Sequence, residues 1–252
     1  MGKAYCSSDW HGVGAVADKV YEFLQPDDKL YFLGDSTDRG PDGVRLFQAL
    51  VNDPRVVYIK GNHDEMFARG IYAIYSLHDS EGFLYHWFSN GGNKTADGLS
   101  NVTEDEAWEM REKILLMPTE VHYKSPKGHT VILEHAGHSP FGISRRSHDP
   151  LWDRSHFFDP WEGPENWYLV HGHTPTMYLR LEYGYDGMEP LTKTEIKHRK
   201  DWWKEENKKI MTPEVIRYCS GHKFDIDMCT VVSNRIALLD LDTFEVKYFD
   251  GD

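Results

Sequence analysis

Cysteine is scarce in this sequence, with three residues among 252, at positions 6, 219 and 229. An odd and sparse set without zinc-like spacing excludes the disulfide framework of small secreted proteins and indicates a reducing compartment. The sequence also lacks an apolar run of membrane-spanning length, and no signal-peptide pattern precedes the first apolar segment. We therefore expect a cytoplasmic protein that has no membrane partner.

Positive charge is in deficit, because 28 Lys and Arg residues face 41 Asp and Glu residues and the net charge is −13. An acidic chain repels nucleic acids and anionic membranes in general, so we expect no nucleic-acid partner. The deficit does not exclude phosphate binding, since metal ions and a few arginines can reverse the field locally. With 40% hydrophobic residues, the chain can form a sizeable core.

The first sixty residues alternate between predicted strands and predicted helices. Apolar segments at 4–7, 29–33 and 55–59 predict strands, and helical spacing of apolar residues predicts helices at 13–24 and 43–50. This β-α-β-α-β order predicts a parallel sheet with helices packed on it. In such sheets ligands bind beyond the carboxyl ends of the strands.

The stretch from 65 to 117 is predicted to be mostly helical, as an insertion that flanks the site. Asn90-Gly91-Gly92 interrupts it. Thr103 and Glu106 have the spacing of a capping box, which predicts the start of another helix.

Later segments predict further strands, at 130–133 and 167–170. Three more, at 224–228, 235–241 and 245–249, are expected to be antiparallel and to form a second sheet stacked on the first.

A charged helix is predicted at 192–210, inside a second insertion at about 190–212. We interpret it as a solvated helix whose tryptophans, Trp202 and Trp203, pack on the domain; the alternative is a lid or a docking face for an acidic partner. No repeat, low-complexity tract or clear linker divides the chain, so residues 1–252 are predicted to form a single domain.

Five short segments rich in Asp, His or Asn each follow a predicted strand. Carboxylate, imidazole and amide oxygen are the ligand types that hold pairs of hard or borderline divalent metals. A pair of metals of this kind clamps phosphate and generates hydroxide at neutral pH, so the segments together predict a two-metal phosphoesterase. The segments are Asp9-Trp10-His11-Gly12, Gly34 to Gly40, Gly61-Asn62-His63-Asp64, Glu134-His135-Ala136-Gly137 and Gly172-His173-Thr174-Pro175.

The predicted ligands divide into two sets that share one carboxylate. Asp9 and His11 are two residues apart, so on an extended strand end both side chains point to the same side and reach one metal. A carboxylate has two oxygens and can bridge two cations, which is the role we expect for Asp35. The first cation is predicted to bind Asp9, His11 and Asp35, and the second Asp35, Asn62, His135 and His173.

His63 is left beside the ligand Asn62 and is free to face a substrate. Asp38 is expected to hydrogen-bond one ring nitrogen of His63, which makes His63 a general acid for the leaving oxygen. Arg39 and Arg154 carry forked donors that suit phosphate oxygens. The expected reaction is in-line attack on phosphorus by a hydroxide that bridges both metals, without a covalent phosphoenzyme.

With these residues in place, the sequence resembles the calcineurin-like metallophosphoesterase superfamily. The fit is to the motif Gly-Asp-x-x-Asp-Arg-Gly at Gly34 to Gly40, to Asn62-His63, and to the segment 172–175. More narrowly it resembles the bacterial and phage branch of the Ser/Thr protein phosphatase family. Members of that branch carry stretches similar to His86-Trp87 with Asn90-Gly91-Gly92, and to Trp152-Asp153-Arg154.

This resemblance implies an α/β fold, a β-sandwich of mixed sheets flanked by helices, around a binuclear metal centre. It implies the ligand sets and the His63–Asp38 pair given above, with manganese, iron or zinc as the metals. Asp64 departs from the glutamate that commonly follows the motif histidine, which shortens the reach of this carboxylate. Pro175 stands where the broader superfamily often has another metal-binding histidine.

Four functions are compatible with these motifs. We expect a phosphomonoesterase of the Ser/Thr protein phosphatase type, acting on a phosphorylated protein or a small phosphoester. The alternative is hydrolysis of a dinucleoside polyphosphate such as diadenosine tetraphosphate, which uses nearly all the same motifs. A nuclease is disfavoured by the acidic charge balance. A non-catalytic binding module is disfavoured by the intact set of ligands and by His63.

Overall fold

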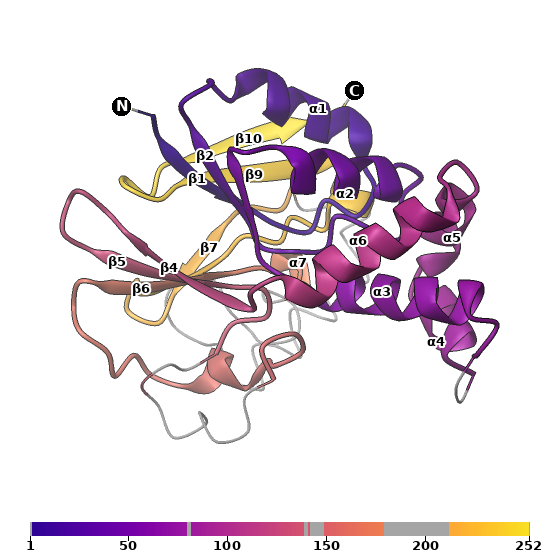
Figure 1. Cartoon of the computed structure of the whole chain (residues 1–252). Helices are drawn as coiled ribbons and strands as arrows, with labels where there is room; N and C mark the ends of the chain where they lie inside the picture. Colours follow the sequence, from indigo (N-terminus) through magenta and orange to yellow (C-terminus); the bar gives the residue numbers. More distant parts are fainter. Residues whose placement is uncertain (1, 80–81, 139–140, 142–148, 179–211, 252) are drawn as a thin grey trace, which may run out of the picture.

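The structure is a computed structural model that describes residues 2–79, 82–138, 141, 149–178 and 212–251. Two five-stranded sheets lie face to face, and helices flank them (Figure 1). The predicted α/β class with two mixed sheets is therefore confirmed.

The first sheet has the strand order β10-β9-β1-β2-β3. As predicted, β1, β2 and β3 are parallel, with Cys6 opposite Tyr31. Strand β9 pairs antiparallel with both β1 and β10. The strands are β1 (Ala4–Ser7), β2 (Lys29–Phe32), β3 (Val56–Tyr58), β9 (Arg235–Asp240) and β10 (Val246–Asp250).

The second sheet has the order β4-β5-β6-β8-β7, and its three central strands are parallel. The outer strands β4 and β7 pair antiparallel with β5 and β8. The strands are β4 (Glu120–Lys124), β5 (Thr130–Glu134), β6 (Trp167–His171), β7 (Ile216–Tyr218) and β8 (Lys223–Asp225).

The prediction that the last three strand segments form the second sheet together is wrong. Only the segment at 224–228 contributes to that sheet, as β8, whereas β9 and β10 extend the first sheet. The reason lies in β9, which is apolar on both faces. Ile236 and Leu238 pack toward the helices, and Leu239 packs between the sheets. A strand buried on both faces belongs inside a sheet, and β9 fills the open side of β1.

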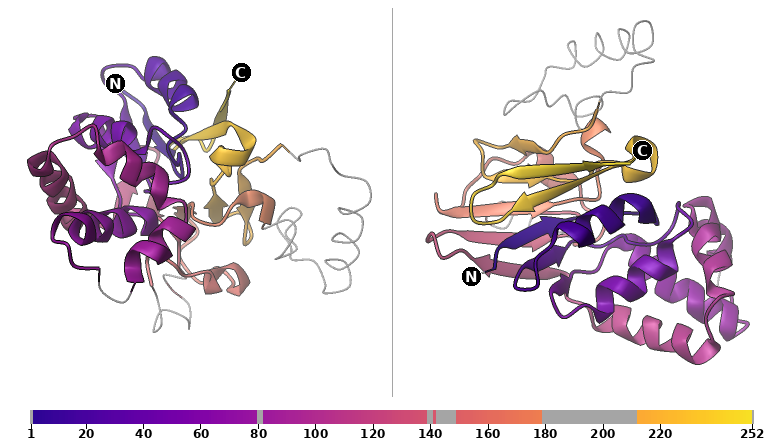
Figure 2. Two further views of the ribbon diagram at one scale, coloured as in Figure 1. Left: turned by 90° about the vertical axis from the view of Figure 1, so that its right-hand side faces the viewer. Right: turned by 90° about the horizontal axis from the view of Figure 1, so that it is seen from above.

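The helices fall into two groups (Figures 1 and 2). Helices α1 and α2 cover the outer face of the first sheet, and α3 to α6 gather beyond one end of the sheets. The second group contains most of the helical stretch predicted at 65–117. As predicted, the helical structure is interrupted there, at Gly91. The helices are α1 (Gly14–Phe23), α2 (Gly43–Asn52), α3 (Asn62–Tyr75), α4 (Phe83–Ser89), α5 (Gly92–Leu99), α6 (Glu104–Leu116), α7 (Thr176–Tyr178) and α9 (Thr230–Ser233), with a 3-10 turn at Ser155–Phe158.

Helix α6 begins as its sequence predicts. The Glu106 backbone N–H donates to Oγ1 of Thr103 at 3.2 Å, and the Thr103 N–H donates to the Glu106 carboxylate at 2.7 Å. This reciprocal capping box satisfies two N–H groups that the first turn leaves without partners. The charged helix predicted at 192–210 lies outside the described residues.

Two apolar cores position the strands that lead to the site. Alternation along β1 places Ala4 and Cys6 in the core between the sheets and Tyr5 in the core beneath the helices. Cys6 is fully buried and free, as expected from its place in the first strand. Because β1 is buried on both faces, its position is fixed by packing, and the start of the loop that follows it is fixed as well.

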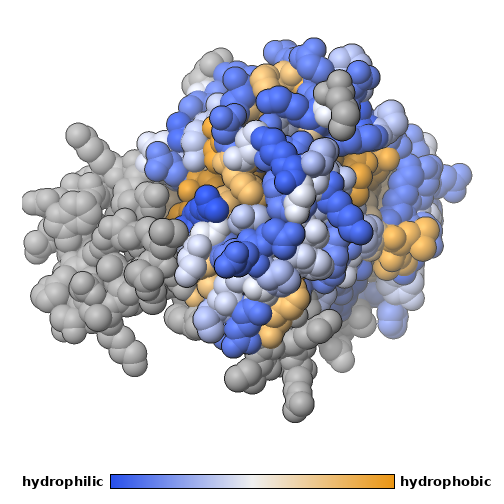
Figure 3. Space-filling model, turned by 90° about the vertical axis from the view of Figure 1, so that its left-hand side faces the viewer, coloured by the Kyte–Doolittle hydropathy of each residue, from blue (hydrophilic) through white to orange (hydrophobic). Residues whose placement is uncertain are grey.

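The face shown in Figure 3 is predominantly hydrophilic, and its apolar residues form small, separate patches. Among the described residues, no helix is both long and apolar enough to cross a membrane.

Candidate metal centre

The site lies where loops from both sheets meet. The loops after β1 and β2 are joined directly, because Asp9 N–H donates to the Gly34 carbonyl at 3.1 Å and His11 N–H to the Asp35 carbonyl at 3.0 Å. Gly172 N–H, after β6, donates to the His135 carbonyl, after β5, at 2.8 Å. The carboxyl ends of neighbouring parallel strands thus bring the predicted segments together.

The backbone at the ligands differs from the extended strand end that the sequence predicts. The φ angles are 55° at Asp9, 43° at His11, 61° at Asp35 and 66° at His173. These values are left-handed, a conformation that costs about 1–2 kcal/mol for a residue with a side chain. The expectation that Asp9 and His11 point the same way because they alternate along a strand is therefore wrong. A tight turn directs both side chains inward instead.

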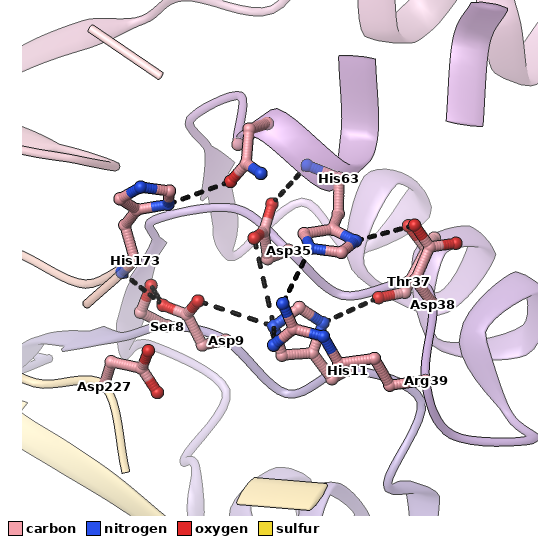
Figure 4. Close-up of polar contacts among 12 residues, drawn as sticks. Ser8, Asp9, His11, Asp35, Thr37, Asp38, Arg39, His63, His173 and Asp227 are labelled. Atoms are coloured by element: carbon pink, nitrogen blue, oxygen red, sulfur yellow. Dashed lines mark hydrogen bonds and ion pairs between the residues drawn. The ribbon is translucent and has the colours of Figure 1, made fainter. Parts of the chain in front are cut away.

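The Asp35 carboxylate lies at the centre of the cluster (Figure 4). Its Oδ2 atom is 3.3 Å from Nε2 of His135 and 3.9 Å from Nε2 of His11. The His11 Nε2 atom is in turn 3.6 Å from Oδ1 of Asp9. One carboxylate therefore connects a ligand from the first sheet with a ligand from the second.

The remaining predicted ligands complete this chain of contacts. Oδ1 of Asn62 is 2.8 Å from Nε2 of His135 and 3.0 Å from Nδ1 of His173. Nδ1 of His135 donates to the Leu33 carbonyl at 2.6 Å, which leaves Nε2 facing the site. The structure thus brings all six predicted ligands into one buried cluster.

These side chains fit a pair of divalent cations. Donor atoms of Asp35, His135 and His173 all lie within 4.8 Å of one another, and so do those of His11, Asp35 and His63. Nε2 of His173 is buried without a hydrogen-bond partner among the described residues. Carboxylate, imidazole and amide donors are the set that manganese, iron and zinc accept. The cluster would hold one cation on each side of Asp35.

Histidine balances the negative charge of the buried carboxylates in this cluster. Burial opposes ionisation of Asp35, but the charge of the neighbouring His135 favours it, and the pKa of Asp35 lies well below its ordinary value. Burial likewise opposes the charge on His135, yet Asp35 raises the pKa of His135 to about 10. The imidazolium of His135 is therefore the counterion of Asp35, a place that a divalent cation would take.

His63 and Asp38 form a buried pair, with Nδ1 of His63 2.7 Å from Oδ2 of Asp38. Helices α4 and α5 fix the carboxylate. Trp87 Nε1 donates to Asp38 at 3.0 Å, and Thr95 Oγ1 donates to it at 2.7 Å. Gly92 makes room for Trp87, since a Cβ there would lie 2.2 Å from Nε1 of that ring. The His86-Trp87 and Asn90-Gly91-Gly92 stretches thus orient Asp38 and, through it, His63.

Arg39 makes a contact that the sequence did not predict. Its guanidinium lies 2.8 Å from Nε2 of His11 and 2.9 Å from Nε2 of His63. Arginine stays protonated in proteins, so both ring nitrogens accept. His11 then donates its Nδ1 proton to the Thr37 carbonyl at 2.9 Å. Burial and the charge of Arg39 lower the pKa of His11, which keeps this imidazole neutral.

Arg154 lines a cavity of about 430 Å³, and His11, Arg39 and His173 line the same cavity. Nε of Arg154 donates to Oγ1 of Thr174 at 2.9 Å. The cavity mouth carries the half-exposed apolar side chains of Tyr178 and Val232. Both predicted phosphate-binding arginines therefore face one space beside the metal ligands.

Asp64 holds the metal loops by their backbone. Its Oδ2 atom accepts from the N–H of Gly61 at 2.8 Å and of Asp35 at 3.0 Å, and its Oδ1 accepts from the Tyr58 hydroxyl at 2.8 Å. Burial and the neighbouring Asp35 raise the pKa of Asp64 to about 7. The short side chain thus reaches the backbone of a metal ligand directly.

Sequence reasoning missed two groups beside the ligands. Ser8 Oγ donates to Oδ2 of Asp9 at 2.5 Å. The buried Asp227 lies near Asp9 (Figure 4), and burial and the Asp9 charge raise its pKa well above the ordinary value. The sequence prediction put Asp227 inside a strand at 224–228, but β8 ends at Asp225. Asp227 therefore lies just past a parallel strand, which is the same kind of position that located the predicted ligands.

Further histidines support the loops around the site. His171 is buried as expected, and its Nε2 lies 2.7 Å from the Tyr218 hydroxyl. His156, which the sequence left unassigned, is buried with its Nε2 2.8 Å from the Ala136 carbonyl. His138 is buried against Glu134. These contacts anchor the loops after β5 and β6.

Comparison with known proteins agrees with this geometry. The family model described as calcineurin-like phosphoesterase matches residues 3–224. A structure provisionally assigned as a diadenosine tetraphosphatase is similar with a TM-score of 0.56 at 16% identity, covering 100% of this chain and 94% of that one. A metallophosphoesterase from Sphaerobacter thermophilus gives 0.52 at 14% identity, covering 99% and 88%. A cold-active protein tyrosine phosphatase of a psychrophilic Shewanella species gives 0.52 at 15%, covering 99% and 81%. No curated protein sequence matches this chain.

Proposed function

This chain belongs to the calcineurin-like phosphoesterase family, whose members are metal-dependent phosphoester hydrolases, and we propose that it is a phosphomonoesterase acting on phosphoserine or phosphothreonine in proteins. The observation that carries the proposal is the cavity that joins Arg39 and Arg154 to the metal ligands. A terminal phosphate carries two negative charges and three free oxygens, whereas a diester carries one charge. Two arginines beside a two-metal cluster suit the dianion better.

The chain's own residues divide the work of hydrolysis among them. Arg39 and Arg154 would bind the non-bridging phosphate oxygens and offset their charge. Asp38 accepts the Nδ1 proton of His63 and fixes the ring, so that Nε2 is the atom that delivers a proton to the leaving oxygen. Two cations held by the six ligands, manganese, iron or zinc, would supply Lewis acidity and a water of lowered pKa.

Substrate binding has to move Arg39. In the structure the guanidinium donates to Nε2 of His63, the atom from which the acid would deliver its proton. A phosphate dianion in the cavity competes for the same donors through charge-assisted hydrogen bonds, which are stronger than those to a neutral imidazole. Arrival of the phosphate would therefore release Nε2 of His63 from this hydrogen bond.

The surroundings of the cavity favour a polypeptide as the carrier of the phosphate. Val231, Val232 and Tyr178 are exposed at the cavity lining, where they offer apolar contact to side chains on either side of a phosphorylated residue. The net charge of −13 favours substrates that are not themselves polyanions. A dinucleoside polyphosphate, the main alternative, carries several negative charges along its length.

A paired assay tests this proposal. The protein, supplied with manganese, is given a phosphoserine peptide and, separately, diadenosine tetraphosphate at matched concentrations. The proposal requires a higher kcat/KM for the peptide. Faster cleavage of diadenosine tetraphosphate would assign the chain to the alternative activity. No turnover of any phosphoester with metals bound would indicate a non-catalytic binding module.

A further inference from the structure

A second cavity, of about 260 Å³, lies between α3, α6 and the start of α4. None of the residues that line it also lines the cavity beside the metal ligands. Its floor consists of small or apolar residues, because Ala68 and Ala73 of α3 and Ile114 of α6 are buried there. Because the side chains of these two alanines are small, they do not fill the cavity.

Cationic side chains surround this apolar floor. The Arg69 guanidinium lies 4.1 Å from the centroid of the Phe83 ring, and that of Arg111 lies 5.5 Å from the centroid of Tyr72. Lys60 lies on the same lining. A cation–π contact with a ring uses none of the N–H donors of a guanidinium, so these donors can still meet a further acceptor.

The structure leaves donors here without acceptors. Nε of Arg111 is buried and has no hydrogen-bond partner among the described residues. Nη1 of Arg111 donates to the carboxylate of Glu112 at 2.7 Å, so this guanidinium is only partly paired. Among the described residues, the side chains of Lys60 and Arg69 form no hydrogen bond or ion pair. A buried donor without an acceptor destabilises the fold, and an anionic group that reached it would offset this cost.

Charge at this cavity is opposite to that of the whole chain. Lys60, Arg69 and Arg111 line it together with Glu65, and Glu112 pairs with Arg111, so the cationic side chains still outnumber the acids. The chain as a whole carries a net charge of −13. A local surplus of positive charge around an apolar floor attracts and orients an anion that has an apolar part.

We propose that this cavity binds a small organic anion, one acidic group carried on an aromatic or short aliphatic body. The acidic group pairs with Arg69 and Arg111, and the body lies on the Ala68–Ile114 floor between the rings of Phe83 and Tyr72. The site is separate from the phosphoesterase centre and does not depend on which phosphoester that centre cleaves.

Naphthalene-2-sulfonate is a suitable probe, because a sulfonate is not a phosphoester and cannot be turned over. It is titrated calorimetrically into the full chain with inorganic phosphate present to fill the metal-centre cavity. One site per chain is expected. The uncharged naphthalene-2-sulfonamide should bind about tenfold more weakly, the loss expected for a charge-assisted hydrogen bond. Equal binding of both compounds, or no binding of the sulfonate, overturns the proposal.

Matched variants locate the site. Arg69→Met and Arg111→Met keep an apolar stem over the ring and should each weaken sulfonate binding about tenfold. Arg45→Met removes an arginine from α2 that is paired with Asp18, and should leave binding unchanged. Equal loss in all three variants, or no loss in either cavity variant, contradicts the proposal. Amide resonances of Ala68 and Ala73 should shift on titration of the unmodified chain, and a titration that leaves both unmoved also contradicts it.

Discussion

Nδ1 of His63 lies 2.7 Å from Oδ2 of Asp38, and both side chains are buried at the edge of the ligand cluster. This pairing leaves the other ring nitrogen of His63 directed toward Arg39, which lines the cavity. The acid role of His63 can therefore be separated experimentally from metal binding.

Replacing His63 should remove the proton donor without removing the metals. His63→Asn is expected to retain both cations and to lose about 100-fold or more in kcat on phenyl phosphate, a substrate with a poor leaving group. The loss should be much smaller on 4-nitrophenyl phosphate, whose leaving group needs no proton. Loss of metal without a separate effect of the leaving group would contradict the assignment.

The shared carboxylate is tested by Asp35→Asn. An amide has one oxygen with which to ligate, so it cannot bridge two cations as a carboxylate does. Elemental analysis of protein purified without chelator should show both metals reduced together. Asp42→Asn, which changes a half-exposed acid at the N-cap of α2, is the control and should retain the full content. Loss of only one metal from Asp35→Asn would show that Asp35 does not bridge.

Arg154 is expected to act on the substrate alone. Arg154→Ala should raise KM and lower kcat, with kcat/KM falling about tenfold or more because a charge-assisted contact to phosphate is lost. Metal content should not change, since Arg154 contacts Thr174 rather than a ligand. Unchanged kinetics on the phosphopeptide would remove Arg154 from the site.

Gly61 leaves room for the carboxylate of Asp35. A Cβ at this position would lie 2.1 Å from Oδ1 of Asp35, so Gly61→Ala should displace that side chain. Metal affinity is expected to fall about 10–100-fold, as for other residues that orient a ligand. Gly98→Ala, which meets only a Val44 methyl group, is the matched control. Equal metal affinities of the two variants would contradict this reading of the packing.

The capping box of α6 should contribute measurably to stability. Thr103→Ala removes the side chain that accepts from the Glu106 N–H and is expected to destabilise the protein by about 1 kcal/mol. Thermal unfolding should show this as a fall in Tm of about 2–4 °C. Glu106→Gln keeps an acceptor for the Thr103 N–H, so its Tm should be close to that of the unmodified protein. A larger fall for Glu106→Gln than for Thr103→Ala would show that charge, not capping, dominates.

The sequence predicted the location of the site better than its local geometry. Parallel strands have their carboxyl ends at one edge, so the positions of Asp35 and Asn62 after β2 and β3 were sufficient to bring them together. The left-handed backbone at Asp9 and His11 was not predictable, because neither residue type demands it. Interaction with the loop after β2 holds that conformation, and such contacts between distant segments leave no trace in local spacing.

The sequence likewise predicted where strands occur better than it predicted which sheet they join. Alternation and turn residues predicted that segments near 235–241 and 245–249 are strands, but not which sheet they join. That choice depends on which open edge best covers the apolar residues on both faces of β9. Asp227 was missed for a related reason, since the end of β8 is set by its pairing with β6 rather than by its own residues.

The position of β9 has a consequence for biosynthesis. Asp9 follows β1, which lies between β2 and β9, so the strand that carries the first ligand is completed by residues more than two hundred positions later. A nascent chain would contain all six predicted ligands once residue 173 had been synthesised. One edge of β1 would still be unpaired at that point. The final position of β1, and with it the geometry around Asp9, should therefore await the arrival of 235–240.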